Sequence, residues 1–262
     1  MRIVVCVKHV PDVQGERAFT SDGLVDRSRG DGTLNELDEN AVEAAVSLVE
    51  EHGGEVVVLT MGPADAEDAV RRGLQMGADQ AVHVHDDALA GSDSMVTAEI
   101  LAAAVRHIAQ DGQVDLVVTG MAALDGLMSV VPTLLAAHLE LPRATLAARL
   151  AVADGQVTIT RELDHATEEL TAPLPALVSV TDQTNQPRYP NFKAIMAARK
   201  KPVTALSLAD LGVDPSRAGA AGSRTRVLAA EPRPARENRV LITDEGDAGL
   251  RLAQFLVDNR LV

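Results

Sequence analysis

The stretch Ile3-Val4-Val5-Cys6-Val7 is apolar at every position and rich in β-branched side chains. A strand with one face in water alternates apolar and polar residues, whereas a strand covered on both faces reads as a continuous apolar run. The first strand of this chain is therefore predicted to lie inside a parallel sheet that has helices on both faces.

Working outward from this strand, the sequence alternates between strand and helix periods. Further buried strands are predicted at 56–61, 81–84 and 114–120. Helical spacing of apolar residues predicts helices at 35–51, 64–76, 95–109 and 126–139. This alternation predicts an α/β fold with a doubly wound, mostly parallel sheet.

The pattern changes after Leu141-Pro142. Successive antiparallel strands are predicted at 145–152, 156–162 and 168–172, and a further strand at 175–181. Asp154-Gly155 is a typical hairpin turn. Residues 210–239 are rich in Pro, Arg, Ala and Ser and predict an extended arm, and 248–259 predict a final helix. We expect residues 1–205 to form the α/β domain with its antiparallel extension, and 206–262 to form an arm and C-terminal helix.

Composition limits the classes of function. The chain has 262 residues and a net charge of −14, which argues against nucleic acid, because nucleic-acid binding is driven by cationic patches. No apolar run approaches the ~20 residues that span a bilayer, so membrane insertion is not expected. The lone cysteine, Cys6, fits a reducing compartment, and no signal segment is recognised. We expect a cytoplasmic location.

One short segment departs from this acidic background. Two of the four aromatic residues and three of the four lysines lie between Pro187 and Lys201. Aromatic and Arg residues are common anchors of protein interfaces, so this docking segment (residues 187–201) is predicted to bind a partner. The alternative interpretation is that Phe192 packs on the protein's own core, and that Lys200 and Lys201 are a solvated helix end.

The candidate ligand site lies at the carboxyl ends of the parallel strands, where open α/β sheets bind ligands. The loop Gly120–Gly126 has glycine at both ends and precedes a predicted helix, whose free N–H groups suit a phosphate. A plain strand-to-helix turn is the alternative. Asn35 is a favoured helix N-cap, an interpretation that needs no ligand. The sequence contains no GxGxxG, no P-loop and no metal-ligand spacing of histidines.

Six segments in this order resemble the electron transfer flavoprotein beta subunit nearly from end to end. They are Val4–Asp12, Asn35–Ala45, Met61–Pro63, Met76–Asp79, Arg161–Asp164 and, most specifically, Pro187–Lys201. The resemblance implies a Rossmann-like, adenine-nucleotide-binding domain that forms a heterodimer with an alpha subunit. FAD is then expected mainly in the alpha subunit, and AMP in this chain.

The resemblance also implies the residues of the AMP pocket. They are Cys6, Asn35, Glu36, Leu37, Asp38, Met61, Gly120, Asp125, Gly126, Ser129, Val130 and Val131. The chain departs from many relatives at Met121–Leu124, where those relatives carry polar residues, and at Glu36, where they carry proline. Side-chain contacts to the nucleotide are therefore expected mainly from Ser129, with backbone amides supplying the rest.

In this family the docking segment recognises dehydrogenases through one apolar anchor, which matches Phe192 and is flanked by Tyr189, Ile195 and Met196. Glu162 matches an acidic residue that meets an arginine of the mobile flavin domain, although an exposed strand residue is an equally simple interpretation. The arm and last helix are expected to pack on the alpha subunit through an apolar face. That face comprises Leu252, Ala253, Phe255 and Leu256.

The sequence therefore predicts a subunit that passes electrons from flavin-dependent dehydrogenases to a downstream acceptor and has no catalytic residue of its own. Two alternatives stay open. One is a bifurcating relative with a second FAD in place of AMP. The other is a stand-alone adenine-nucleotide-binding module.

Overall fold

The computed structural model describes residues 1–15, 18–28, 31–231, 233–235 and 239–262. The chain forms two compact units, Met1–Ala229 and Ala230–Val262. The first unit contains the whole α/β fold, and the second is described separately below.

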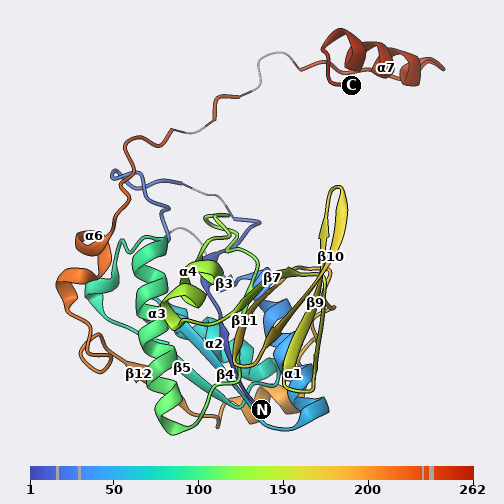
Figure 1. The fold of residues 1–262 in the computed structure, drawn as a ribbon. Coiled ribbons are helices and arrows are strands. Elements are labelled where there is room, and N and C mark those ends of the chain that lie inside the picture. The colour runs from blue at the N-terminus through green and yellow to red at the C-terminus, as the bar shows by residue number, and fades with distance from the viewer. Residues whose placement is uncertain (16–17, 29–30, 232, 236–238) are drawn as a thin grey trace. The chain divides into compact units, whose positions relative to one another are not determined.

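The main sheet is parallel, as predicted, and has seven strands, of which β12 was not predicted (Figure 1). Their order across the sheet is β12-β5-β4-β1-β6-β11-β7. The bounds are β1 (Arg2–Cys6), β4 (Glu55–Met61), β5 (Gln80–Val84), β6 (Leu116–Gly120), β7 (Arg143–Ala147), β11 (Ala176–Val180) and β12 (Val203–Leu206). The chain builds β4 and β5 on one side of β1 and then crosses to β6 on the other side. The strand order therefore reverses at the β1–β6 boundary, which is where such sheets hold ligands.

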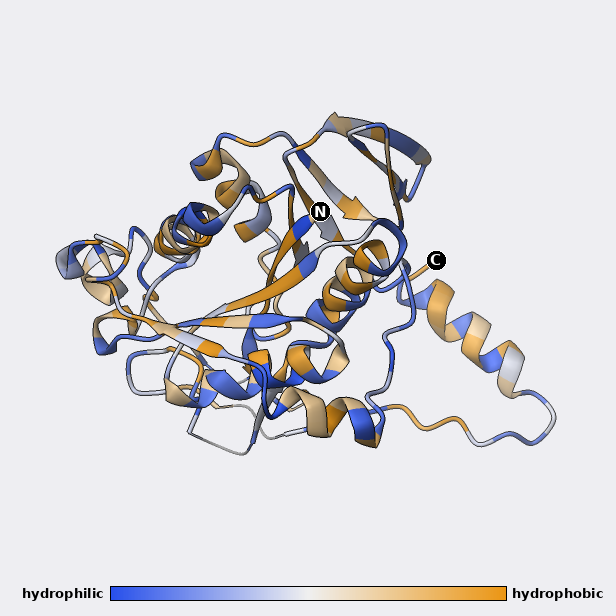
Figure 2. Ribbon diagram, turned by 90° about the horizontal axis from the view of Figure 1, so that it is seen from below, coloured by the Kyte–Doolittle hydropathy of each residue, from blue (hydrophilic) through white to orange (hydrophobic). Residues whose placement is uncertain are grey.

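Helices cover both faces of this sheet (Figure 1). The two core clusters place α1 (Glu36–His52) and α2 (Glu67–Met76) on one face, and α3 (Ser94–Ile108) and α4 (Val131–Leu139) on the other. Ile3 and Val5 enter the first cluster, while Val4 and Cys6 enter the second, because successive strand residues point to opposite faces. Figure 2 shows the resulting apolar strands in the interior of the first unit.

The antiparallel extension differs in part from the prediction. It consists of β8 (Arg149–Ala153), β9 (Gln156–Leu163) and β10 (Ala166–Pro173). The predicted strand 145–152 is split, since its first part belongs to β7 of the parallel sheet and only its second part to β8. Within β7, Leu146 has φ +64°, a left-handed conformation at an irregularity of the β7–β11 pairing. The turn at Asp154-Gly155 is confirmed, with positive φ at both residues.

Smaller elements complete the first unit. A two-stranded sheet pairs β2 (His9–Pro11) with β3 (Gly32–Leu34). The remaining pieces are the short helices α5 (Phe192–Ala198) and α6 (Gly219–Gly222) and the 3-10 turns η1 (Ala64–Ala66), η2 (Asp87–Leu89), η3 (Ala109–Asp111) and η4 (Pro215–Arg217).

The first part of the predicted arm, up to Ala229, belongs to the first unit. Leu208 and Ala218 are buried in the same core cluster as α3. The Asp93 carboxylate caps α3 with one oxygen, and its other oxygen accepts the backbone N–H groups of Arg224 and Thr225 at 2.8 and 2.9 Å. The interpretation of 210–239 as an extended arm throughout is therefore wrong for its first part. This segment has little apolar periodicity because local hydrogen bonds and a few buried side chains hold it in place, so its packing was not predicted. The role of residues 206–262 in binding a partner stays a prediction.

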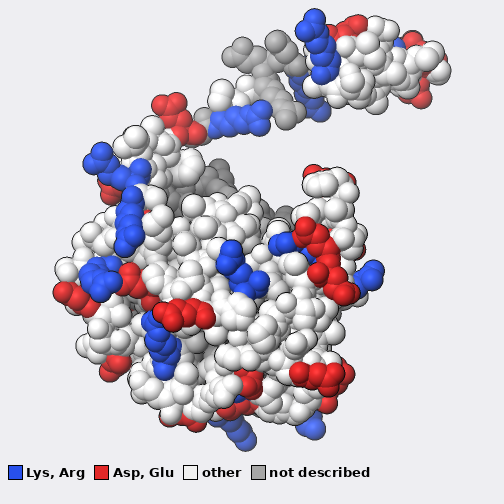
Figure 3. All heavy atoms as spheres, viewed as in Figure 1, with Lys and Arg blue, Asp and Glu red and all other residues white. Residues whose placement is uncertain are grey.

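The second unit contains the final helix, α7 (Ala248–Asp258), close to its predicted bounds. None of its residues is buried, and Leu250 and Leu252 are exposed. On the face of the first unit seen in Figure 3, basic and acidic side chains lie in mixed groups separated by uncharged surface. No helix in the described part of the chain is long and apolar enough to cross a membrane.

Candidate functional site

The end of β6 lies against the first turn of α1, at the point where the strand order reverses. Asp38 of this turn is buried, and its Oδ2 accepts the backbone N–H of Lys8, just beyond β1, at 2.8 Å. A Cβ added to Gly120 would stand 2.4 Å from Asp38 Oδ1 and 2.7 Å from the carbonyl oxygen of Leu37. Only glycine therefore fits at the end of β6, since any side chain would push α1 away from the strand.

Burial alters the acid–base chemistry of two predicted site residues. Burial raises the pKa of Asp38 to about 7, even though hydrogen bonds from Asn35, Lys8 and Gly120 favour its ionised form. Burial and the nearby Asp38 carboxylate raise the pKa of the Cys6 thiol to about 12. The Cys6 thiol therefore stays protonated at neutral pH. It is unreactive and acts as an apolar side chain, because only a thiolate is an effective nucleophile.

Asn35 crosses the crevice and holds the loop between β6 and α4. Its Nδ2 donates to the carbonyl of Ala122 at 2.9 Å, and its Oδ1 accepts the N–H of Leu124 at 3.0 Å. The side chain is fully buried and caps no backbone N–H at the start of α1. Asn35 is therefore the N-cap residue, as predicted, but its side chain does not cap the helix. Its amide instead shapes the loop that was predicted to bind a phosphate.

Asp125 lies in a cluster of charges at the same edge. The Lys8 ammonium is 3.0 Å from its Oδ1 and 2.9 Å from its Oδ2, and the Arg27 guanidinium donates to Oδ2. The Asp125 side chain is only 3% exposed, whereas Lys8 and Arg27 are 44% and 42% exposed. Burial opposes ionisation of Asp125, but the two cations and their hydrogen bonds keep its pKa below the usual value. Two cations thus face one carboxylate at the edge of the crevice.

The loop after β6 is longer than predicted. The expected helix from 126 begins only at Val131, with Pro132 in its first turn. Leu127 and Ser129 have φ +52° and +53°, left-handed values that exclude an earlier helix start. Ser129 and Gly126 are exposed, and Val130 and Val131 are half-buried. The loop therefore offers its backbone to solvent over several residues before α4 begins.

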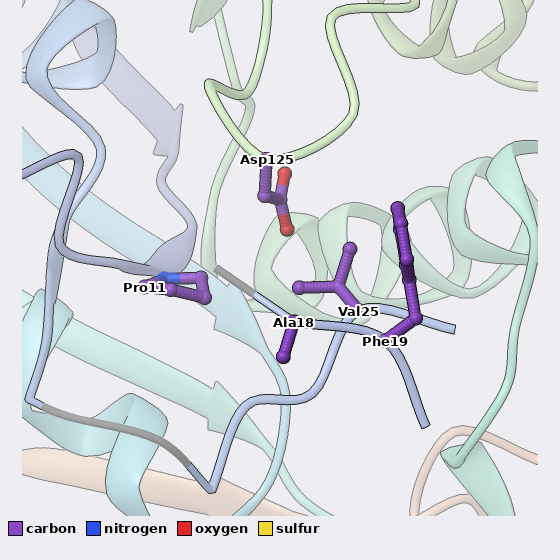
Figure 4. A pocket seen from close by; sticks show the side chains of 5 residues that line it. All are labelled: Pro11, Ala18, Phe19, Val25 and Asp125. Atoms are coloured by element: carbon purple, nitrogen blue, oxygen red, sulfur yellow. The ribbon is translucent and has the colours of Figure 1, made fainter. Parts of the chain in front are cut away.

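A cavity of about 160 Å³ lies beside this loop (Figure 4). Figure 4 shows Asp125 opposite Val25 across the cavity. Its lining comprises Pro11, Ala18, Phe19, Val25 and Asp125. The volume is well below the roughly 300 Å³ of a small ligand pocket, so this cavity alone does not hold a nucleotide.

The structure unites some of the predicted pocket residues. Cys6, Asn35, Asp38 and Gly120 lie at one edge of the sheet, and Asp125 joins them through Lys8. Met61 ends the next strand, and Glu36 is exposed in the first turn of α1. Lys8 and Arg27 were not predicted to be site residues. The position of Lys8 directly after β1 was a usable signal, whereas nothing around Arg27 marks it.

The predicted docking segment has its aromatic side chains in solvent. Tyr189 and Phe192 are 89% and 78% exposed, Met196 is also exposed, and Ile195 is half-buried. The alternative that Phe192 packs on the protein's own core is therefore wrong. The Arg72 guanidinium of α2 lies 5.3 Å from the centre of the Tyr189 ring. Glu162 is exposed on β9.

Comparison with known proteins agrees with this arrangement. The sequence model of the electron transfer flavoprotein domain matches residues 22–211. The chain is 43% identical to the electron transfer flavoprotein subunit beta of Mycobacterium leprae, over 99% of each chain. The chain belongs to the electron transfer flavoprotein beta subunit family. The alignment with the Mycobacterium leprae protein spans both the crevice at the β1–β6 boundary and the docking segment.

Other relatives of the chain bear different names. The chain is 36% identical to Protein FixA of Azorhizobium caulinodans, over 97% of this chain and 94% of FixA. It is 34% identical to CarD of Acetobacterium woodii, over 93% of this chain and 92% of CarD. CarD is described as a subunit of a caffeyl-CoA reductase–Etf complex. Among the described residues, no group of three or more His, Cys, Asp or Glu side chains is placed to hold a metal ion.

Replacement of Gly120 tests the close approach in this electron transfer flavoprotein beta chain. Gly120→Ala should lower the free energy of unfolding by about 2 kcal/mol, because the new methyl group would overlap Asp38 and Leu37. Gly126→Ala is the matched control, since nothing lies within 4 Å of a Cβ there, and should stay within about 0.5 kcal/mol of wild type. Urea titrations measure both. Equal stability of the two variants would contradict the packing described here.

Asp38 should make stability depend on pH in an unusual direction. Its pKa is about 7 in the folded chain and 3.8 in the unfolded one, so the folded state binds the proton more tightly. Between those values, stability rises as pH falls. Relative to Asp38→Asn, the wild type should therefore gain about 2 kcal/mol in free energy of unfolding from pH 8 to pH 5. Unfolding of both proteins across this range measures the gain, and a constant difference would show that Asp38 remains ionised.

Proposed function

We propose that this chain is the beta subunit of a heterodimeric electron transfer flavoprotein that carries electrons from flavin-dependent dehydrogenases to a downstream acceptor. Family membership over nearly the whole chain, together with the exposed aromatic docking segment, carries the proposal. FAD is held mainly by an alpha subunit and supplies the redox chemistry. This chain contributes no catalytic residue and acts by binding and positioning.

AMP is the proposed ligand of the crevice at the β1–β6 boundary. The absence of a side chain at Gly120 lets the strand end approach α1, and Asn35 fixes the loop whose backbone amides are to bind the nucleotide. The exposed cations Lys8 and Arg27 outnumber the Asp125 carboxylate and favour a phosphate at this edge. The proposed pocket comprises Cys6, Asn35, Glu36, Leu37, Asp38, Met61, Gly120, Asp125, Gly126, Ser129, Val130 and Val131.

The docking segment is proposed to bind the dehydrogenases. Phe192 is the anchor for an apolar pocket of the partner, with Tyr189, Ile195 and Met196 around it. Glu162 is proposed to pair with an arginine of the mobile flavin domain. An exposed pair of this kind contributes at most about 1 kcal/mol, which biases the position of a domain without fixing it.

The second part of the chain is proposed to bind the alpha subunit. None of the residues of α7 is buried, so Leu252, Ala253, Phe255 and Leu256 form a face that needs a partner. We propose that residues 206–262 supply this contact. The residues at the start of this range also pack in the core of the first unit. The heterodimer is proposed to be cytoplasmic.

A bifurcating relative, with a second FAD in place of AMP, is the second candidate. CarD is named as a subunit of a caffeyl-CoA reductase–Etf complex, and this name is the reason to keep the bifurcating candidate. A stand-alone nucleotide-binding module is disfavoured, because it would need neither the exposed docking segment nor the uncovered face of α7.

Nucleotide content distinguishes these candidates. The chain is co-expressed with its alpha subunit, and the nucleotides released by denaturation are quantified. One FAD and one AMP per heterodimer are the expected result for a simple electron carrier. Two FAD without AMP would assign the chain to the bifurcating group, and a nucleotide-binding monomer without flavin would overturn the heterodimer.

Phe192→Ala tests docking separately. Loss of the exposed anchor should lower kcat/KM for reduction by a dehydrogenase about tenfold or more, with flavin content unchanged. Met95→Ala is the control, since Met95 is also an exposed apolar residue but lies on α3, on the opposite face of the sheet from α1 and α2. Equal kcat/KM for wild type and Phe192→Ala at limiting partner concentration would rule out Phe192 as the anchor.

A further inference from the structure

The helix of the docking segment, α5, buries too little of its surface to fix its own position on the protein. α5 has seven residues, of which only Ala198 is buried. Isolated helices shorter than about 12 residues are marginal in water. The Asn191 side chain accepts the N–H of Ala194 and caps the helix, which contributes roughly 1 kcal/mol. A cap specifies where a helix starts, but it does not specify where the helix lies on the protein. α5 also lies against α2, but with a single buried side chain, Ala198, so most of its placement must come from the residues on either side of it.

Arg188, four residues before α5, is the strongest of these attachments. Its Nε donates to Glu43 at 2.8 Å, and one terminal nitrogen bridges Glu43 and Glu50 at 3.0 and 2.9 Å. The other terminal nitrogen donates to Glu50 at 2.6 Å. The backbone N–H of Arg188 also donates to Glu43, at 2.9 Å. The guanidinium therefore holds two carboxylates, about two turns apart on α1, in a planar bidentate arrangement.

The burial of Glu43 makes this clamp stronger than an ordinary surface pair. Its side chain is only 11% exposed and also accepts the Ser47 hydroxyl at 3.0 Å. Burial opposes ionisation of Glu43, but its hydrogen bonds with Arg188 lower its pKa overall. Bonds with Glu50 and Glu43 in turn raise the pKa of Arg188. Loss of Arg188 would leave a buried carboxylate without its counter-charge.

Other contacts hold the chain before and after α5, one to α1 and one to the loop that follows α2. Asn185 and Asn40 exchange side-chain to backbone hydrogen bonds at 2.9 and 3.0 Å. After α5, the Lys201 ammonium donates to the carbonyl of Ala78. Both ends of the docking segment are thus fixed to the rest of the first unit, while the exposed Tyr189 and Phe192 lie between them.

We propose that Arg188 is the positioning residue of the docking helix, and that its clamp on Glu43 and Glu50 holds Phe192 ready to enter an apolar pocket of the partner. The inference rests on the proposed docking function and adds to it a residue that itself need not touch the partner. Pre-ordering of the segment lowers the entropy that docking must overcome.

Hydrogen exchange of the heterodimer tests the clamp without any dehydrogenase. In Arg188→Gln, the hydrogen-bonded amides of residues 194–198 should exchange about tenfold faster or more, while those of 41–48 in α1 stay protected. Glu43→Gln should reproduce the effect, and Glu50→Gln should give a smaller one, because Glu50 is 60% exposed. Arg149→Gln, at an exposed position of β8, is the control for loss of one charge. Unchanged exchange in Arg188→Gln, or equal acceleration in Arg149→Gln, would overturn the clamp.

Kinetics test the consequence for docking. Arg188→Gln should raise KM for the partner dehydrogenase about tenfold, with kcat and flavin content unchanged, and Arg188→Lys should recover only part of the loss, because lysine lacks the planar fork. If Arg188 acts through Phe192, the double variant Arg188→Gln/Phe192→Ala should be no worse than Phe192→Ala alone. Additive losses, or a fall in kcat or flavin content, would contradict a positioning role. If the wild type accepts no electrons from any flavin dehydrogenase, the proposed function and the docking role are both wrong. Hydrogen exchange still decides in that case whether the clamp exists.

Discussion

The contact between Gly120 and the first turn of α1 is the constraint on which the rest of the first unit depends. It brings the ends of β1 and β6 and the start of α1 within hydrogen-bond distance of the buried Asp38. Once these three ends are joined, Asn35 can span the gap to the following loop, and Lys8 can reach Asp125. The geometry of the crevice is thus a consequence of one missing side chain and one buried carboxyl group.

Much of the fold follows from patterns that the sequence displays openly. Continuous apolar runs mark strands covered on both faces, and their alternation with helical periods predicts the parallel sheet. The prediction failed where the pattern does not say which sheet a strand joins. Residues 145–152 were predicted to form one strand, yet 145–147 belong to β7 of the parallel sheet and 149–152 to β8 of the antiparallel extension. The pairing partners decide this split, and no periodicity reveals them.

The candidate site was less predictable because its contacts join residues far apart in the chain. Asn35 has the identity and position of an N-cap, but its amide bonds to Ala122 and Leu124. Arg27 lies in a stretch without any recognisable pattern and still reaches Asp125. The docking segment was easier to recognise, since its basic and aromatic composition contrasts with the acidic chain. Its attachment through Arg188 was not, because the two glutamates it holds look like ordinary solvated residues of a helix.

The clamp at Arg188 also divides the docking segment into two kinds of position. Arg188 fixes the shape of the segment through α1, with Asn185 just before it, whereas Tyr189, Phe192 and Met196 face solvent and contribute little to folding. Substitutions at the exposed positions can therefore accumulate without loss of the scaffold beneath them. In evolutionary terms, recognition is free to diverge between lineages while the framework stays constant, so one subunit design can be retuned for new redox partners.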